Sequence, residues 1–388
     1  MMNSDNGRAI YIWGAGSCGA DTFYTLKRRD SVKGYIDSDI KKQGRSVNGI
    51  KVFSPDILDS FNEDTKPFVV IASTWAEEIE KQILLKGYVE YRDYLFNYNM
   101  DLLSDNWIEQ YNRFNHISNK LGDALTLREL QDFDDQFWFW MNTKGYREHR
   151  CLKNIIPPLP SEEIQVRLTG VFGDASLRHA FNQYRIIKEL LGHQNIKISK
   201  LDTILDFGCG YGRILRFFAK DGINAKLYGT DISRGLVEWC RNNIKFGDYH
   251  INNPWPPIDF EDNTFSLIFA YSVFSHLSEK SHLLWLEELH RILKPEGLLI
   301  FTIWAHPSKT RKYHEPHFPE YEKLIRDYEN NKYCYSNLLY DGADTYGEAL
   351  IPVAYMRDRW AEKFDILEVT DSHLNSPGQN YIVLRKRY

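Results

Sequence analysis

The chain has few cysteines, and they are not arranged as a metal site or a disulfide framework. The five cysteines are odd in number and far apart, and none forms a Cys-x-x-Cys pair. Zinc sites and disulfide-stabilised secreted domains need closely spaced or even-numbered sets. We therefore expect a cytoplasmic protein in a reducing compartment, without a bound metal.

Long apolar runs and an excess of positive charge are also missing. No segment approaches the ~20 apolar residues of a membrane-spanning helix, and the start MMNSDNGR lacks the apolar core of a signal peptide. The formal net charge is −5, whereas proteins held to nucleic acids by phosphate contacts carry concentrated basic surfaces. From these absences we expect a protein with no membrane span and no nucleic-acid partner.

The most informative segment that is present is LDFGCGYGR at 205–213. The pattern predicts a buried strand over 201–205, then a glycine turn, then a helix whose first residues are 214–219. Glycines at this spacing let the backbone turn sharply and approach a ligand closely. The turn has no lysine followed by serine or threonine, which excludes a phosphate-binding P-loop.

A second apolar strand follows in YGTDIS at 228–233, and it ends in Asp231. A carboxylate at the tip of this strand can accept hydrogen bonds from the two hydroxyls of a ribose. Strand, glycine turn, helix, strand and acidic tip in this order predict a nucleoside site at the carboxyl edge of a parallel sheet.

Downstream segments extend the pattern to a family resemblance. PPIDFEDNTFSLIFAYSVFSHL at 256–277 and LHRILKPEGLLIFTI at 289–303 follow the glycine turn in order and spacing. Together they resemble class I S-adenosylmethionine-dependent methyltransferases over residues 165–388. The resemblance implies an α/β fold with a Rossmann-like seven-stranded sheet, S-adenosyl-L-methionine as cofactor, and methyl transfer as the reaction.

The resemblance also implies which residues hold the cofactor. Asn252 stands where many relatives have an acidic residue, and its amide oxygen can accept a hydrogen bond from the amine of adenine. Alternatively, Asn252 only forms a turn before Pro254. The expected cofactor contacts are Asp206, Phe207, Gly208, Cys209, Gly210, Asp231, Ile232, Asn252 and Tyr271.

A hydroxyl acceptor would need a base to take its proton. His276, just after the expected fourth strand, is the first candidate, and His306, after the fifth, is the second. His276 could equally hold its own loop by a hydrogen bond. Residues 305–363 are expected as an insertion over the carboxyl edge that forms much of the acceptor pocket. Weaker candidates in this insertion are His314, His317, Asp341 and Asp344.

A second glycine turn lies near the start of the chain. AIYIWGAGSCGADTFYTLKRR at 9–29 again predicts strand, turn and helix, and KGYIDSD at 33–39 predicts a second strand ending in Asp37. We expect a small Rossmann-like α/β domain over residues 1–98. It resembles the domain found in sugar acetyltransferases and other polysaccharide-biosynthesis proteins.

This second resemblance implies a nucleotide sugar as a partner of the front domain. Gly14, Gly16 and Asp37 would contact it. The alternative is that the glycines serve only a tight turn and the packing of the helix. The domain is half of a full dinucleotide-binding fold, so a dehydrogenase role is poorly supported.

Residues 99–164 are expected to form a helical, aromatic-rich connecting region before the methyltransferase domain at 165–388. Within it, WIEQYNRFNHISNKL at 107–121 has apolar residues at three- and four-residue steps. QFWFWM at 136–141 could stack on a sugar ring, but a role as interdomain core is favoured.

Three functional hypotheses follow. The leading one is O-methylation of a sugar-containing acceptor in surface polysaccharide or glycoconjugate synthesis. The second keeps methyl transfer but changes the acceptor to a small natural product or a protein side chain. The third is a non-catalytic nucleotide-binding scaffold or regulator of a glycan-assembly complex.

Overall fold

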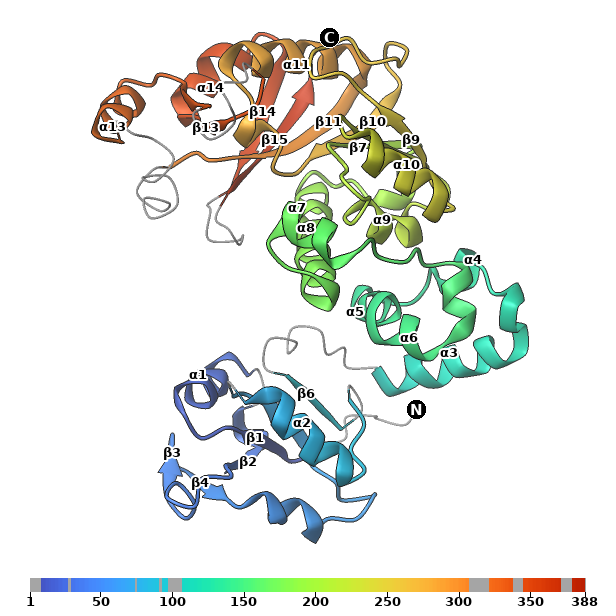
Figure 1. Ribbon diagram of the computed structural model, residues 1–388, viewed down its shortest axis with the longest axis vertical. Helices are drawn as coiled ribbons and strands as arrows, with labels where there is room; N and C mark the ends of the chain where they lie inside the picture. Colours follow the sequence, from blue (N-terminus) through green and yellow to red (C-terminus); the bar gives the residue numbers. More distant parts are fainter. Residues whose placement is uncertain are drawn as a thin grey trace. The chain divides into compact units, whose positions relative to one another are not determined.

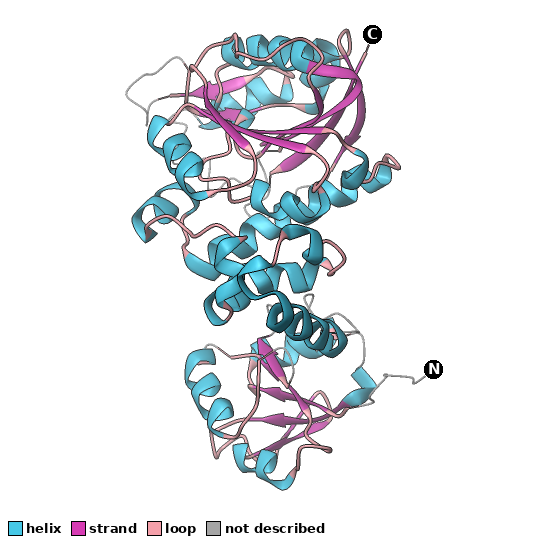
Figure 2. Cartoon of the chain, turned by 90° about the vertical axis from the view of Figure 1, so that its right-hand side faces the viewer, coloured by secondary structure: helices cyan, strands magenta, loops and turns pink. Residues whose placement is uncertain are grey.

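The computed structural model describes residues 8–26, 29–73, 75–90, 93–96, 107–306, 321–337, 345–370 and 379–387. The chain divides into two compact units (Figures 1 and 2). One comprises Met1–Leu121 with Phe133–Phe137, and the other Gly122–Asp132 with Trp138–Tyr388. The helical region expected at 99–164 is thus shared between the units, and the domain boundaries at 98 and 164 stay predictions.

The first unit is built on a mainly parallel sheet with the order β3-β4-β2-β1-β5-β6 among the described residues. Only β3 runs antiparallel, against β4. Its strands are β1 (Ile10–Trp13), β2 (Val32–Ile36), β3 (Ser46–Val47), β4 (Ile50–Phe53), β5 (Phe68–Ile71) and β6 (Tyr94–Phe96). Its helices are α1 (Ser17–Thr25), η1 (Arg29–Ser31), η2 (Pro55–Ser60), α2 (Ala76–Leu85) and α3 (Trp107–Leu121).

Alternation of side chains along β1 gives this sheet two buried faces, as expected for a parallel sheet covered by helices. Tyr11 and Trp13 belong to the core cluster that contains Ile79 and Ile83 of α2. Ile10 and Ile12 belong to the cluster beneath α1. The two crossover helices therefore cover opposite faces of the sheet.

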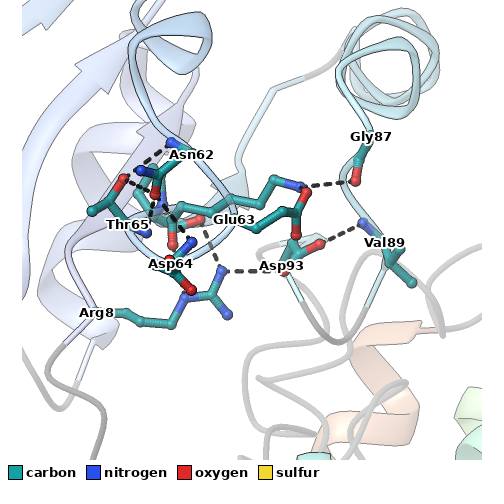
Figure 3. A network of polar contacts seen from close by, with 10 residues as sticks. Arg8, Asn62, Glu63, Asp64, Thr65, Gly87, Val89 and Asp93 are labelled. Atoms are coloured by element: carbon teal, nitrogen blue, oxygen red, sulfur yellow. Dashed lines mark hydrogen bonds and ion pairs between the residues drawn. The ribbon is translucent and has the colours of Figure 1, made fainter.

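A polar network holds together the segments that enter β1, β5 and β6 (Figure 3). The Arg8 guanidinium donates to Asp93 Oδ1 at 3.2 Å, and Asp93 Oδ2 accepts from Val89 N at 2.9 Å. The Lys66 ammonium donates to Glu63 Oε1 at 2.6 Å and to Gly87 O at 3.0 Å. The carboxyl edge of the sheet, with its glycine turn, lies at the other end of these strands.

The second unit contains a sheet of seven described strands in the order β14-β15-β11-β10-β7-β8-β9. All are parallel except β15, which runs antiparallel to both β11 and β14. The strands are β7 (Thr203–Phe207), β8 (Lys226–Asp231), β9 (Asp248–Ile251), β10 (Phe265–Ala270), β11 (Leu293–Ile303), β14 (Phe364–Val369) and β15 (Asn380–Lys386). This mixed sheet has the Rossmann-like strand order expected of a class I methyltransferase.

Helices flank this sheet, and a two-stranded sheet adds to the unit. The helices are α4 (Leu127–Leu130), α5 (Asp135–Trp140, which spans the division between the units), η5 (Met141–Gly145), α6 (Tyr146–Glu148), α7 (Glu162–Thr169), α8 (Gly173–His193), α9 (Leu215–Asp221), α10 (Arg234–Asn243), η8 (Phe274–His276), α11 (Glu279–Ile292), α13 (Tyr321–Glu329) and α14 (Val353–Trp360). The short turns are η4 (Gly122–Ala124), η6 (Arg150–Asn154) and η7 (Ile198–Lys200). The small sheet pairs β12 (Cys334–Ser336) with β13 (Glu348–Leu350).

Each face of the large sheet has its own aromatic packing. Trp285 of α11 and Trp360 of α14 join the core cluster under one face. On the other face, the rings of Phe218 in α9 and Phe269 in β10 stack at 4.8 Å. The strand expected over 201–205 begins and ends two residues later, because pairing with β8 continues up to Phe207, directly before the left-handed Gly208.

The aromatic residues of the segment 136–141 are buried, whereas their expected role as interdomain core stays a prediction. Trp138 and Trp140 are 1% and 2% exposed, and Trp138 Nε1 donates to the Phe217 carbonyl of α9 at 3.2 Å. Arg216 beside it is also buried and donates to the carbonyls of Pro157 and Pro158. Burial lowers the pKa of Arg216 to about 10. These side chains tie the connecting segment to α9 and leave no aromatic surface for a sugar.

A buried histidine should make stability depend on pH. His282 of α11 is fully buried, with its ring stacked on Trp360 at 5.1 Å, and burial lowers its pKa to about 3. The unfolded chain takes up this proton near pH 6.5. The contribution of His282 is therefore complete above pH 6.5 and is lost progressively as the pH falls towards 3.

We expect His282→Leu to weaken the pH dependence measured by denaturant unfolding between pH 7 and pH 5. For each pH unit below 6.5, the folding equilibrium constant of the native protein should fall roughly tenfold through His282. The variant should not show this fall. The exposed His116→Gln is the control and should retain the native slope. An unchanged slope in His282→Leu would contradict the assignment.

Among the described residues, no helix combines the length and the apolar character needed to cross a membrane.

Candidate active site

The candidate site lies where the strand order of the large sheet reverses, between β7 and β10. In open α/β sheets, ligands bind at such a point, outside the carboxyl ends of the strands. The glycine turn leaves β7, Asp231 ends β8, Asn252 follows β9, and Tyr271 follows β10. The sheet therefore brings to one edge residues that are far apart in sequence.

Asp231 holds the glycine turn. Its Oδ2 accepts from Gly210 N at 2.9 Å and its Oδ1 from Ser233 N at 2.8 Å. The turn is tied to β8 a second time, since the N–H groups of Gly208 and Cys209 donate to Thr230 O. Each carboxylate oxygen retains a further lone pair, which is what two ribose hydroxyls require. Burial raises the pKa of Asp231, although these backbone hydrogen bonds oppose the rise.

Gly208 is required by the turn in two ways. Its φ is +78°, a left-handed conformation that favours glycine, and an added Cβ would lie 2.3 Å from Val273 Cγ2. At Gly210, with φ +56°, an added Cβ would meet only Leu168 Cδ1 at 3.8 Å in the part of the chain that the structure describes, so this backbone borders open space there. Close packing behind the turn and space in front of it suit a ligand that lies against the backbone.

Asp206 and Cys209 lie behind the turn. Asp206 is 2% exposed, and burial, together with the nearby Asp231 charge, raises its pKa to about 8, although Arg213 opposes the rise. The thiol of Cys209 faces that of Cys240 and is buried, and both effects raise its pKa. A protonated, buried thiol is a poor nucleophile, so Cys209 is suited to packing beside a ligand. Phe207 is likewise buried, with its ring against Trp285.

The adenine end of the expected site is formed by Asn252 and Ile232. Asn252 is 8% exposed; its Nδ2 donates to Asn253 O at 2.9 Å, while its buried Oδ1 has no hydrogen-bond partner among the described residues. A buried acceptor without a partner is costly, and an adenine amine would satisfy it. Ile232 is 55% exposed, an apolar side chain available to an aromatic base. The residues present therefore fit an adenosine.

Two interpretations of Asn252 can be separated by binding measurements. We expect Asn252→Leu to weaken binding of S-adenosylhomocysteine by roughly tenfold in calorimetry, because one hydrogen bond is lost. Asn252→Asp keeps an acceptor and should bind at least as well as the native protein. The neighbouring Asn253→Leu is the control. If native protein and Asn252→Leu bind S-adenosylhomocysteine equally well, Asn252 serves only to form the turn.

Tyr271 is held by residues that sequence analysis did not single out. Its hydroxyl lies 3.1 Å from His179 Nε2 of α8, and Arg213 lies over its ring at 5.5 Å. Arg213 also donates to His179 Nδ1 at 2.8 Å. The arginine is always a donor, so His179 is neutral and carries its proton on Nε2. Burial raises the pKa of Tyr271 to about 12. No sequence signal marked His179, because it lies on a separate helix.

The two base candidates have different surroundings. His276 has a side chain 12% exposed and lies against the segment 346–348 that leads into β13. His306 follows β11 and is exposed, with its ring near Tyr328 of α13 at 6.1 Å. His314, His317, Asp341 and Asp344 lie outside the described residues. Among the described residues, no cluster of His, Cys, Asp or Glu is suited to hold a metal ion.

The front glycine turn repeats part of this geometry. An added Cβ on Gly14 would lie 2.1 Å from Ala72 O, and one on Gly19 would lie 1.8 Å from Gly14 O. Tight packing alone therefore accounts for these two glycines. Gly16 differs, because no atom of the described residues lies within 4 Å of its Cβ position.

Asp37 corresponds to Asp231 but has a lysine beside it. Its Oδ2 accepts from Ala15 N and from the Lys42 ammonium, both at 2.9 Å. Burial would raise the pKa of Asp37, but the hydrogen bonds from Asp39, Lys42 and Ala15 outweigh it and lower the pKa. Lys42 thus competes with a ribose for this carboxylate. A nucleotide contact by Gly14, Gly16 and Asp37 remains a prediction.

Comparison with known proteins identifies the part of the chain that carries the candidate site. Residues 204–297 match a family model described as a methyltransferase domain. Over these residues the chain is therefore similar to methyltransferase domains. The cofactor indicated for them is S-adenosylmethionine. Residues 6–93 match a different model, described as C2185-like, N-terminal.

The curated relatives are methyltransferases with diverse acceptors. A glycine/sarcosine/dimethylglycine N-methyltransferase from Actinopolyspora halophila is 29% identical over 30% of this chain and 21% of its own. A tRNA (carboxymethyluridine(34)-5-O)-methyltransferase from Arabidopsis thaliana is 34% identical over 26% of this chain and 24% of its own. The chain thus spans about a quarter or less of these relatives.

Among solved structures, magnesium protoporphyrin IX methyltransferase from Synechocystis, with bound S-adenosylhomocysteine, is 13% identical with a TM-score of 0.39. The alignment covers 66% of this chain and all of that one. A methyltransferase from Methanosarcina mazei has a TM-score of 0.38 at 19% identity, over 50% of this chain and 96% of its own.

Proposed function

We propose that this chain is an S-adenosylmethionine-dependent O-methyltransferase, acting in the cytoplasm on a sugar-containing acceptor in surface polysaccharide or glycoconjugate synthesis. The observation that carries methyl-donor binding is the buried acceptor of Asn252, beside the Asp231 carboxylate that holds the glycine turn. The sugar acceptor rests on the resemblance of residues 1–98 to a domain of polysaccharide-biosynthesis proteins.

The donor's sulfonium supplies an activated methyl group, so little covalent chemistry is needed from the protein. What the chain must do is hold an acceptor in line, which can lower a barrier by ~7–11 kcal/mol. Asp231, Asn252 and the glycine turn would hold the nucleoside. The carboxyl end of β10 and the segment before β13 would face the acceptor.

The names of the relatives indicate acceptors other than sugars, which should be tested as well. They cover an amino acid, a tRNA, and the malonyl-[acyl-carrier protein] of Buchnera aphidicola. A small natural product or a protein side chain is therefore the second candidate, and RNA belongs in the same comparison. The candidate that is not an enzyme is a non-catalytic nucleotide-binding scaffold or regulator of a glycan-assembly complex.

The test combines binding with an acceptor screen. Calorimetry with S-adenosylhomocysteine measures donor binding, and tritiated methyl transfer is followed to nucleotide sugars, glycosides, glycine, acyl-carrier protein and tRNA. Transfer to a sugar hydroxyl is the expected result. Methyl transfer to another class of compound would show that the acceptor is not a sugar and would identify its class. Binding without any transfer would support the scaffold, and absence of binding would overturn the function altogether.

A further inference from the structure

His276 lies in a polar cluster at the carboxyl end of β10. Its Nδ1 is 2.9 Å from the carbonyl oxygen of Gly347 and 3.3 Å from Glu348 Oε1. The Gly347 carbonyl oxygen can only accept a hydrogen bond, so Nδ1 must be the nitrogen that carries the proton. The neutral imidazole then has its lone pair on Nε2.

The other side of the ring faces a hydroxyl. Ser272 Oγ lies 3.4 Å from His276 Nε2 and accepts from Gln379 Nε2 at 3.1 Å. Since the amide donates to Ser272, the serine proton is left to point towards Nε2. At 3.4 Å this contact is weak. A better-placed hydroxyl or amine can therefore replace Ser272 as the donor to Nε2.

The surrounding backbone fixes this arrangement. Gly347 N donates to His276 O at 2.7 Å, and the Tyr346 ring stacks on the imidazole at 4.9 Å with an interplanar angle of 16°. Glu348 is 2% exposed. Ser272 has a φ of +58°, rare for serine, and its N–H donates to Thr302 Oγ1 at 2.8 Å. A non-glycine residue held in this conformation is often found at a functional site.

We propose that His276 is the base of the methyl transfer and that Glu348 is its positioning residue; this rests on the proposed function. The acceptor's lone pair bonds to the methyl carbon, and the carbon–sulfur bond breaks with its electron pair returning to sulfur. The acceptor's proton goes to His276 Nε2, and Glu348 stabilises the resulting imidazolium through Nδ1–H. The acceptor is thus an O–H or N–H group rather than a carbon.

The tautomer can be tested without an acceptor. Full-length protein labelled with ¹⁵N-histidine is examined by long-range ¹H–¹⁵N NMR near pH 8, and His276→Asn identifies the signal. We expect His276 to carry its proton on Nδ1 in the native protein and also in Glu348→Gln, because the Gly347 carbonyl oxygen remains as an acceptor 2.9 Å from Nδ1. A native ring protonated on Nε2 would overturn the proposal.

Kinetics separate this role from a structural one. His276→Asn keeps an N–H near the Nδ1 position, so the contact to Gly347 O can survive while the base is lost. We expect kcat to fall by roughly 10²- to 10⁴-fold in His276→Asn. In Glu348→Gln it should fall by at least about tenfold, because the imidazolium loses the carboxyl group that faces Nδ1–H. Affinity for S-adenosylhomocysteine should stay native in both variants.

The matched control is Glu288→Gln, which removes another buried carboxylate, bonded to Arg291 on α11. If Glu348→Gln lowers kcat no more than this control does, Glu348 is structural and the proposal is wrong. If the native protein does not bind S-adenosylhomocysteine, the proposed function fails instead.

Discussion

Asp231→Ala should abolish detectable binding of S-adenosylhomocysteine, with the dissociation constant rising by about 100-fold or more. The carboxylate is placed for two ribose hydroxyls, and hydrogen bonds to a charged group contribute roughly 1.5–3 kcal/mol each. The substitution also releases the N–H groups of Gly210 and Ser233, which the carboxylate now holds at 2.9 and 2.8 Å. Calorimetry measures the loss.

Two controls decide what such a loss means. Asp259→Ala removes an exposed carboxylate from the same domain and should bind like the native protein. Asp231→Asn keeps an acceptor oxygen, so its affinity should lie between those of native protein and Asp231→Ala. Native affinity in Asp231→Ala would show that the nucleoside is held elsewhere.

Gly208→Ala should lower both stability and donor affinity. The left-handed φ of +78° costs a residue with a Cβ roughly 1–2 kcal/mol. The contact of 2.3 Å with Val273 Cγ2 adds overpacking, worth roughly 1–3 kcal/mol. Denaturant unfolding should show the sum, and calorimetry should show weaker S-adenosylhomocysteine binding because the turn must shift.

A double-mutant cycle separates the two causes. In a Val273→Ala background the steric clash is gone, so Gly208→Ala should cost only the backbone part of the penalty. Gly235→Ala, in α10 with no described atom within 4 Å of the added Cβ, is the matched control and should be neutral or stabilising. Equal costs for Gly208→Ala in both backgrounds would remove Val273 from the explanation.

The sequence predicted the fold of the second unit well, because its signals are local. Glycine spacing, apolar strands and the Pro-Glu-Gly turn each depend on a few neighbouring residues. The seven-stranded sheet is confirmed, and residues 204–297 match a methyltransferase-domain model. The small strand β6 was not predicted, since three residues over Tyr94–Phe96 carry little periodicity.

The candidate site was predictable only in part. The turn and Asp231 follow from one continuous motif, whereas the ties of Tyr271 to His179 and of His276 to Glu348 join residues 92 and about 70 positions apart. Hydrogen bonds over such separations leave no pattern in a single sequence. The insertion at 305–363 was expected to form much of the acceptor pocket, but no pattern in it indicated a carboxyl group beside His276.

By itself, the sequence determined the donor half of this protein: a glycine turn, an acidic strand tip and the order of strands that places them at one edge. Local backbone conformation and strand periodicity suffice for that. Only the tertiary structure decided that Asn252 keeps a buried acceptor without a partner, that Asp37 has Lys42 beside it, and that His276 carries its proton on Nδ1. Burial and long-range hydrogen bonding exist only once distant segments have packed together.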